Sequence, residues 1–140
     1  MKRSRLNPYS KAQIPKLKRK LDIIFSALIR ERDAKQPCID LCEKTGIQQA
    51  GHFRIRERMS TRWNPKNVNG QNARCNAWDN DGFRHAKGID LRWGAGTAEE
   101  LERISRQIKQ WDARELTALI AAAKLGYSYY VDVYQKIGPK

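Results

Sequence analysis

The sequence predicts an α+β fold that is mostly helical and contains one small strand–loop–strand–helix unit. Two long stretches, residues 16–33 and 113–138, carry apolar side chains at helical spacing. Between them, residues 50–78 hold two short β-type runs around an Asn- and Pro-rich turn, a pattern typical of a hairpin followed by a helix. The third observation is charge, since 28 Lys and Arg against 15 Asp and Glu give a net charge of +13.

The charge excess favours a nucleic acid partner, because contacts to phosphates release bound counterions. An anionic membrane surface or an acidic protein remains an alternative partner. The chain has no run of about 18 apolar residues, so we expect no membrane span. Its N-terminus is charged and has no apolar core, so we expect no signal peptide and a cytoplasmic protein.

The N-terminal residues 1–15 are predicted to form a flexible basic arm. Residues 1–20 contain eight Lys and Arg and no acid, and Pro8 and Pro15 break any early helix. The arm either contacts phosphates or serves as a solubilising tail. From Lys16 to Asp33 the apolar residues follow one helical face, and we expect this helix to pack into the core and to end before Pro37.

The segment 34–48 is predicted to be a turn that carries Cys38 and Cys42. Two cysteines in a turn, spaced as C-x3-C, resemble one half of a zinc site, and a second pair is needed to complete it. The strand that follows is expected from Ala50 to Ile55, the turn at residues 64–67, and a second strand from Val68 to Gln71. Asn72 or Asn76 is then the candidate N-cap of a helix running through residue 78.

The C-terminal region 96–140 is predicted to be helical. A short amphipathic helix over residues 84–94 ends at Gly94, and Thr97 with Glu100 forms a capping box that opens a helix over residues 98–112. Asp112 caps the last long helix, which Gly126 ends or kinks. The tyrosines of this helix are expected to form a packing or partner surface, with a base-stacking platform as the alternative: Tyr127, Tyr129, Tyr130 and Tyr134.

Four short motifs together resemble the phage NinG/Rap recombination endonucleases, a family of the HNH, or ββα-metal, type. They are A-G-H-F (50–53), R-x-x-M-S-x-R-W (56–63), N-V-N-x-Q (67–71) and C-N-x-x-D (75–79). The upstream I-R-E-R-D (29–33) and P-C-I (37–39) are also similar to the family. The resemblance implies an HNH nuclease domain at residues 16–95. It also implies a phage or prophage protein that acts in a bacterial cell as a metal-dependent, structure-selective endonuclease on branched DNA such as Holliday junctions or D-loops.

The resemblance also implies roles for particular residues. His52 is the general base, and Asn67 orients His52 or shapes the loop. Asn76 and Asp79 hold Mg²⁺ or Mn²⁺, unless Asn76 only caps a helix. The residues expected to contact DNA phosphates are Arg54, Arg56, Arg58, Arg62 and Lys66.

The chain departs from the family pattern in the cysteines and before the A-G-H-F motif. Asn72 stands where a second pair would have a cysteine, leaving three thiols: Cys38, Cys42 and Cys75. They either bind Zn²⁺ with water or a side chain such as His85 as fourth ligand, or form a buried cluster without metal. We expect zinc to be lost or weakened. Gln48 and Gln49 replace an acidic residue common in the family.

These departures keep a second hypothesis open, namely a catalytically degenerate protein that binds branched DNA without cutting it. A third hypothesis is a basic protein that binds RNA. For the nuclease we also expect a homodimer formed through the C-terminal helices, because a four-way junction is nearly two-fold symmetric and two cuts need two sites.

Overall fold

The structure is a computed structural model that describes residues 7–42, 49–77 and 82–140. It confirms an α+β fold in which helices dominate and two antiparallel strands form the sheet. The elements in order are η1 (Lys11–Gln13), α1 (Ile14–Asp33), β1 (Gln49–His52), β2 (Val68–Gln71), α2 (Ala73–Ala77), α3 (Gly82–Trp93), α4 (Thr97–Ser105), α5 (Ala113–Leu125) and α6 (Tyr127–Ile137). None of the helices in these ranges combines the length and apolarity needed to cross a bilayer.

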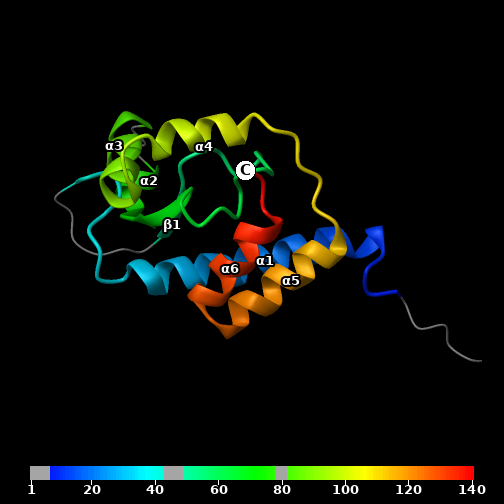
Figure 1. The fold of residues 1–140 in the computed structure, drawn as a ribbon. Helices are drawn as coiled ribbons and strands as arrows, with labels where there is room; N and C mark the ends of the chain where they lie inside the picture. Colours follow the sequence, from blue (N-terminus) through cyan, green and yellow to red (C-terminus); the bar gives the residue numbers. More distant parts are fainter. Residues whose placement is uncertain (1–6, 43–48, 78–81) are drawn as a thin grey trace, which may run out of the picture.

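The hairpin lies between two groups of helices (Figure 1). On one side, α1 packs against α5, α5 packs against α6, and α1 also contacts both strands. On the other side, α3 packs against α4. Because α1 supports one face of the hairpin, side chains from the start of the chain can reach the end of β1.

Each helix group has its own hydrophobic cluster. The first cluster joins α1, α5 and α6 around two buried indoles, those of Trp63 and Trp111, whose rings meet edge to face with centroids 5.8 Å apart. The second cluster joins the cysteine-bearing segment to α3 and α4 through Ile39, Ile89 and Leu101. The C-terminal helices therefore share both cores with the N-terminal half of the chain.

Helix α1 confirms the predicted helix over residues 16–33 but begins two residues earlier, at Ile14, with Pro15 in its first turn. Proline is tolerated there because the first helical N–H groups have no partner within the helix. Its buried residues Leu21, Phe25 and Ile29 recur every four positions, which places them on one face. The predicted arm is thus shorter than 15 residues, and Tyr9 within it lies under the guanidinium of Arg114 at 4.2 Å.

Strand β1 ends at His52, three residues before the predicted end at Ile55. The last paired residues are His52 and Val68. At Arg54 the side chain of Asn67 replaces the backbone of a neighbouring strand. It accepts a hydrogen bond from the Arg54 N–H at 2.8 Å and donates one to the Arg54 carbonyl at 3.2 Å. A side-chain amide that pairs with the backbone offers the chain an alternative to the sheet and ends the strand.

Strand β2 has its predicted bounds, and Asn72 caps the following helix as expected. Its Oδ1 accepts a hydrogen bond from the Arg74 N–H at 3.0 Å, which satisfies one of the free donors at the start of α2. The order β1, β2, α2 is the strand–strand–helix order that the sequence predicts. The end of this helix beyond Ala77 lies outside the described residues.

The C-terminal predictions are partly wrong. The Thr97 side chain forms no cap; it donates to the Gly94 carbonyl at 2.7 Å, and α4 ends at Ser105 rather than at residue 112.

The predicted start of α5 is confirmed, because Asp112 caps this helix in a capping box with Glu115. Gly126 has φ of +134°, which favours glycine, and it separates α5 from α6. Of the four tyrosines, Tyr130 and Tyr134 are core residues.

Replacing Gly88 by alanine is expected to destabilise the protein by about 1–3 kcal/mol. A Cβ at Gly88 in α3 would lie 1.7 Å from the backbone oxygen of Ile39, so α3 would have to move away from the cysteine-bearing segment. Gly82→Ala in the same helix is the matched control, because its Cβ meets nothing within 4 Å. Urea unfolding of both variants measures the difference, and equal stabilities would contradict the prediction.

Candidate active site

His52 lies at the end of β1, and its ring is held by a backbone carbonyl. Its Nε2 lies 2.9 Å from the carbonyl oxygen of Arg62. Because a carbonyl can only accept, Nε2 carries the proton and Nδ1 is unprotonated. Burial lowers the pKa of His52 more than the Arg62 carbonyl raises it, so the ring is neutral at pH 7. A neutral, oriented imidazole is the form that a general base requires.

His52 lines a cavity of about 420 Å³ between α1 and the hairpin. Its walls carry two arginines, Arg30 from α1 and Arg56 from the loop after β1. The remaining lining residues are Asp22, Ile23, Phe25 and Ser26 of α1 with Ala50 and Val68 of the two strands. The cavity thus combines an uncharged imidazole, the carboxylate of Asp22 and two guanidinium groups, and the excess of cations suits an anionic ligand.

Asp22 is the residue of this site that sequence reasoning missed. Its carboxylate accepts from Nε of Arg62 and the indole N–H of Trp63, both at 3.0 Å, and from Nη2 of Arg56 at 2.6 Å. Burial raises its pKa, but the hydrogen bonds from Arg62 and Arg56 outweigh burial and hold that pKa below its usual value. A signal was present, because Asp22 is the only acidic residue among residues 1–30.

The Asn67 side chain does not bind His52, because both its amide atoms bond the Arg54 backbone. It is fully buried and shapes the loop, which is one of the two roles expected for it. The Arg62 carbonyl supplies the orientation of His52 instead.

The expected ligands of Mg²⁺ or Mn²⁺ are only partly described. Asn76 is exposed, and its Nδ2 donates to Oε1 of Gln49 at 2.5 Å. Gln49 precedes His52 by three residues on β1, which corresponds to about 10 Å along the strand. Asp79 lies outside the described residues, so the magnesium or manganese site stays a prediction.

The five cationic residues expected to contact DNA fall into two groups. Arg58 and Lys66 are exposed, and the side chain of Arg56 is 58% exposed although it also contacts Asp22. Arg54 pairs with Glu102 and stacks on Phe53, and Arg62 pairs with Asp22 with its side chain only 13% exposed. The first group is accessible to a phosphate. The guanidinium groups of Arg54 and Arg62 are already paired with carboxylates, so less of their charge is available to a phosphate.

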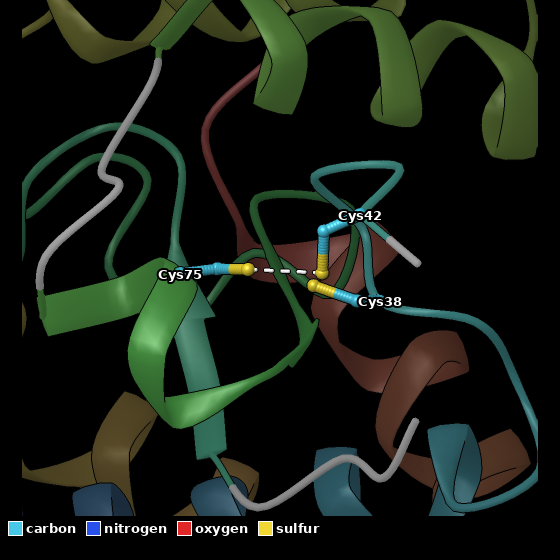
Figure 2. A group of neighbouring side chains, drawn as sticks. All are labelled: Cys38, Cys42 and Cys75. Atoms are coloured by element: carbon cyan, nitrogen blue, oxygen red, sulfur yellow. Dashed lines mark hydrogen bonds between the residues drawn. The ribbon is translucent and has the colours of Figure 1, made fainter. Parts of the chain in front are cut away.

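The three cysteines converge from two parts of the chain (Figure 2). Cys38 and Cys42 come from the turn after α1, Cys75 comes from α2, and all three Sγ atoms lie within 4.8 Å of one another. The Cys75 thiol donates to the Cys42 sulfur at 2.9 Å. In a tetrahedral zinc site, bonds of about 2.3 Å separate the sulfurs by about 3.8 Å. The donor set therefore fits Zn²⁺ with three protein ligands, and the sulfurs of Cys42 and Cys75 would have to separate by about 1 Å to hold the ion.

Position 72, where the family pattern has a further cysteine, contacts this cluster through its backbone. The Asn72 N–H donates to the Cys38 sulfur at 3.3 Å, while the Asn72 side chain caps α2. His85 is not part of the group of metal-ligating atoms found among the described residues. Burial and the neighbouring thiols raise the pKa of Cys75 to about 12, so metal binding must displace protons and will weaken as the pH falls.

Replacing Asn72 by cysteine is expected to tighten zinc binding by about tenfold or more, because a fourth thiolate would complete the tetrahedron. Asn72→Ser is the matched control, since serine also caps a helix and has the shape of cysteine but is no thiolate. Competition titration against a chromophoric zinc chelator measures the affinities. Equal affinity of the two variants would show that position 72 does not reach the metal.

Three buried polar side chains, His85, Asp40 and Gln71, form a second group. His85 Nδ1 lies 3.5 Å from Asp40, and the amide of Gln71 donates to the same carboxylate. The His85 ring also packs on Phe53, with centroids 5.3 Å apart. Although Asp40 is close, burial and the charges of Arg54, His52 and Arg92 lower the pKa of His85 to about 4.

Acid is therefore expected to destabilise the protein through His85. Its pKa is depressed in the folded state, so the full stability is present above pH 6.5 and is lost as the pH falls toward 4. Between pH 7 and pH 5 this residue should account for about 2 kcal/mol. Urea unfolding at both pH values, for wild type and His85→Gln, measures the effect. An identical pH dependence in the variant would contradict it.

The fold and site define an α+β protein with a histidine-bearing hairpin and a cysteine cluster that can hold a metal ion. The family model of the bacteriophage lambda NinG protein matches residues 4–128, and the chain belongs to this phage family. Membership suggests a role related to phage recombination. Comparison with curated proteins and with solved structures found no match.

Proposed function

We propose that the chain is a metal-dependent, HNH-type endonuclease that cuts branched DNA intermediates of recombination, such as Holliday junctions or D-loops. The observation that carries the proposal is the state of His52. The ring is neutral, its Nε2 is held by the Arg62 carbonyl so that Nδ1 is unprotonated, and His52 lines a cavity that also carries cationic groups. Membership of the NinG family and the net charge of +13 support a DNA substrate.

In this proposal each group of residues has one task. His52 accepts a proton from the attacking water at Nδ1, and Arg56 and Arg30 hold the phosphate in the cavity. Asn76 and Asp79 supply the oxygen donors that Mg²⁺ or Mn²⁺ prefers, and such an ion, when bound, stabilises charge on the phosphate and the leaving oxygen. The exposed Arg58 and Lys66 contact the backbone farther along the strand.

A labelled four-way junction beside a linear duplex of matching sequence tests the proposal. Wild-type protein is incubated with each DNA in Mg²⁺, in Mn²⁺ or in EDTA. We expect nicking of the junction in either metal, little nicking of the duplex, and none in EDTA. Equal cutting of both DNAs would remove the branched-DNA specificity, and absence of cutting in every metal would remove the nuclease.

The catalytically degenerate DNA-binding protein remains the second candidate. It is favoured by the contact between Asn76 and Gln49, because two neutral amides lie together where the family often has an acidic residue. Amides alone bind divalent cations weakly, since they lack the charge of a carboxylate. This candidate predicts junction binding that falls steeply with salt and no cleavage in any metal.

The proposed nuclease acts as a homodimer, because paired cuts in a junction need paired sites. The apolar stripe of α5 is already used within the chain, where Leu116, Leu119 and Ile120 are buried. A dimer through the C-terminal helices must therefore use their outer faces, which expose Leu125 and Tyr129. Light scattering over a range of protein concentrations measures the mass, and a constant monomer mass with and without junction DNA would refute the dimer.

A further inference from the structure

A second cavity is lined by residues 64–66, which follow the Arg62 carbonyl that contacts His52. It has a volume of about 850 Å³, which is within the usual range of ligand sites. Its walls come from the loop 64–66, from the start of α4, and from α6. None of the motifs that suggest a nuclease accounts for it, apart from the shared loop.

The cavity has an aromatic wall that is held in place. Trp93 and Tyr127 both line it, and the guanidinium of Arg32 lies 5.1 Å from the centroid of each ring. The indole N–H of Trp93 donates to Asn69 at 3.0 Å, and Arg32 donates to the Tyr127 hydroxyl at 3.1 Å. These contacts fix both rings before a ligand arrives, which reduces the entropy lost on binding.

The rest of the cavity suits a flat apolar group attached to an anion. Pro65, Leu101 and Val131 add apolar surface, and the exposed Lys66 stands at the edge. Glu100 also lines the cavity, but Arg103 forms an ion pair with it and offsets its charge. An aromatic wall beside a cationic side chain is the combination that binds unpaired bases, because each base stacks on a ring while its phosphate meets the charge.

The two cavities are connected through one loop. The Arg62 carbonyl orients His52 at the first cavity, and Asn64 lines the second. At most about 7 Å of backbone separates these two residues. A branch point that reaches this loop can therefore offer a phosphate to the first cavity and an unpaired base to the second.

We propose that the second cavity receives an unpaired nucleobase from the branch point of the DNA. This inference rests on the proposed function and extends it, because it supplies the choice of branched DNA over duplex. A paired base cannot enter, since it remains stacked in its helix, whereas a branch point offers bases that are already partly unstacked.

Val131→Phe, which fills the cavity, tests the inference against Ser128→Phe, which adds the same ring to an exposed position of α6. Each protein is bound to junctions that carry 5-iododeoxyuridine either at the branch point or within an arm, and photocrosslinked peptides are mapped by mass spectrometry. We expect the branch-point base to crosslink to Trp93 or Tyr127 in wild type and in Ser128→Phe, and the arm base not to. Val131→Phe should lose this crosslink and bind the junction about tenfold more weakly, with unchanged duplex affinity.

Thermal unfolding of both variants shows whether each is folded, and the crosslink in wild type does not depend on any substitution. If wild type cuts the junction but no branch-point base crosslinks to the aromatic wall, the inference is wrong and the nuclease stands. If Val131→Phe is folded and binds the junction as wild type does, the inference is wrong as well. If wild type neither binds nor cuts the junction, the proposed function fails and the inference fails with it.

Discussion

Replacing His52 by alanine is expected to slow metal-dependent cleavage of a four-way junction by about 10²–10⁴-fold, the usual contribution of a general base. Junction affinity should change little, because the cationic groups of the cleft and loop remain. In wild type the cleavage rate should decrease only at pH values below 6.5. Burial lowers the pKa of His52, and only the unprotonated ring can accept a proton. Single-turnover cleavage rates and equilibrium binding separate the two effects.

His85→Gln is the matched control, because it removes the other histidine of the chain from a position outside the His52 cavity. It should cut at nearly the wild-type rate at neutral pH. Added imidazole should partly restore His52→Ala and leave His85→Gln unchanged. Cleavage that survives in His52→Ala would show that another group is the base, even if the protein is a nuclease.

Replacing Asp22 by asparagine is expected to have the second largest effect, because one carboxylate holds two arginines and an indole. Its loss should destabilise the protein by about 2–4 kcal/mol, since the Arg62 guanidinium is mostly buried and loses its charge partner. Cleavage should also slow by about tenfold or more, because the Arg62 carbonyl that orients His52 is no longer fixed. Urea unfolding and single-turnover cleavage measure these two consequences.

Glu31→Gln is the control for this experiment, since it removes one negative charge from an exposed position of the same helix. It should leave stability and cleavage close to wild type. The negative charge of Asp22 raises the pKa of His52, so Asp22→Asn should also shift the acid limb of the cleavage profile to lower pH. A lower rate with an unmoved acid limb would mean that Asp22 positions His52 through Arg62 without changing the pKa of His52.

Local patterns in the sequence were sufficient for most of the elements. The four-residue spacing of Leu21, Phe25 and Ile29 predicts α1, and Gly126 predicts the break between α5 and α6. Asn72 and Asp112 predict helix starts, because a side-chain oxygen can satisfy the free N–H groups there. Each of these signals depends on neighbours within about one helical turn, which the sequence displays directly.

Two of the predictions that failed are those in which a second partner competed for the same group. Ala50 to Ile55 has a β-type composition, but the Asn67 amide binds the Arg54 backbone and stops the strand at His52. Thr97 has the spacing of a capping box, yet its hydroxyl donates to Gly94. Composition indicates what a residue can do, and geometry selects among its possible partners.

For the site, the sequence by itself determined the residue types: a histidine after a short strand, three cysteines, and a large excess of cations. Only the tertiary structure decided that the three thiols meet and that Asp22 reaches Arg56 and Arg62. These contacts join residues 33 to 40 positions apart. The reason is physical, because a chain of that length can close in many ways, and the packing of α1 on the hairpin selects one of them.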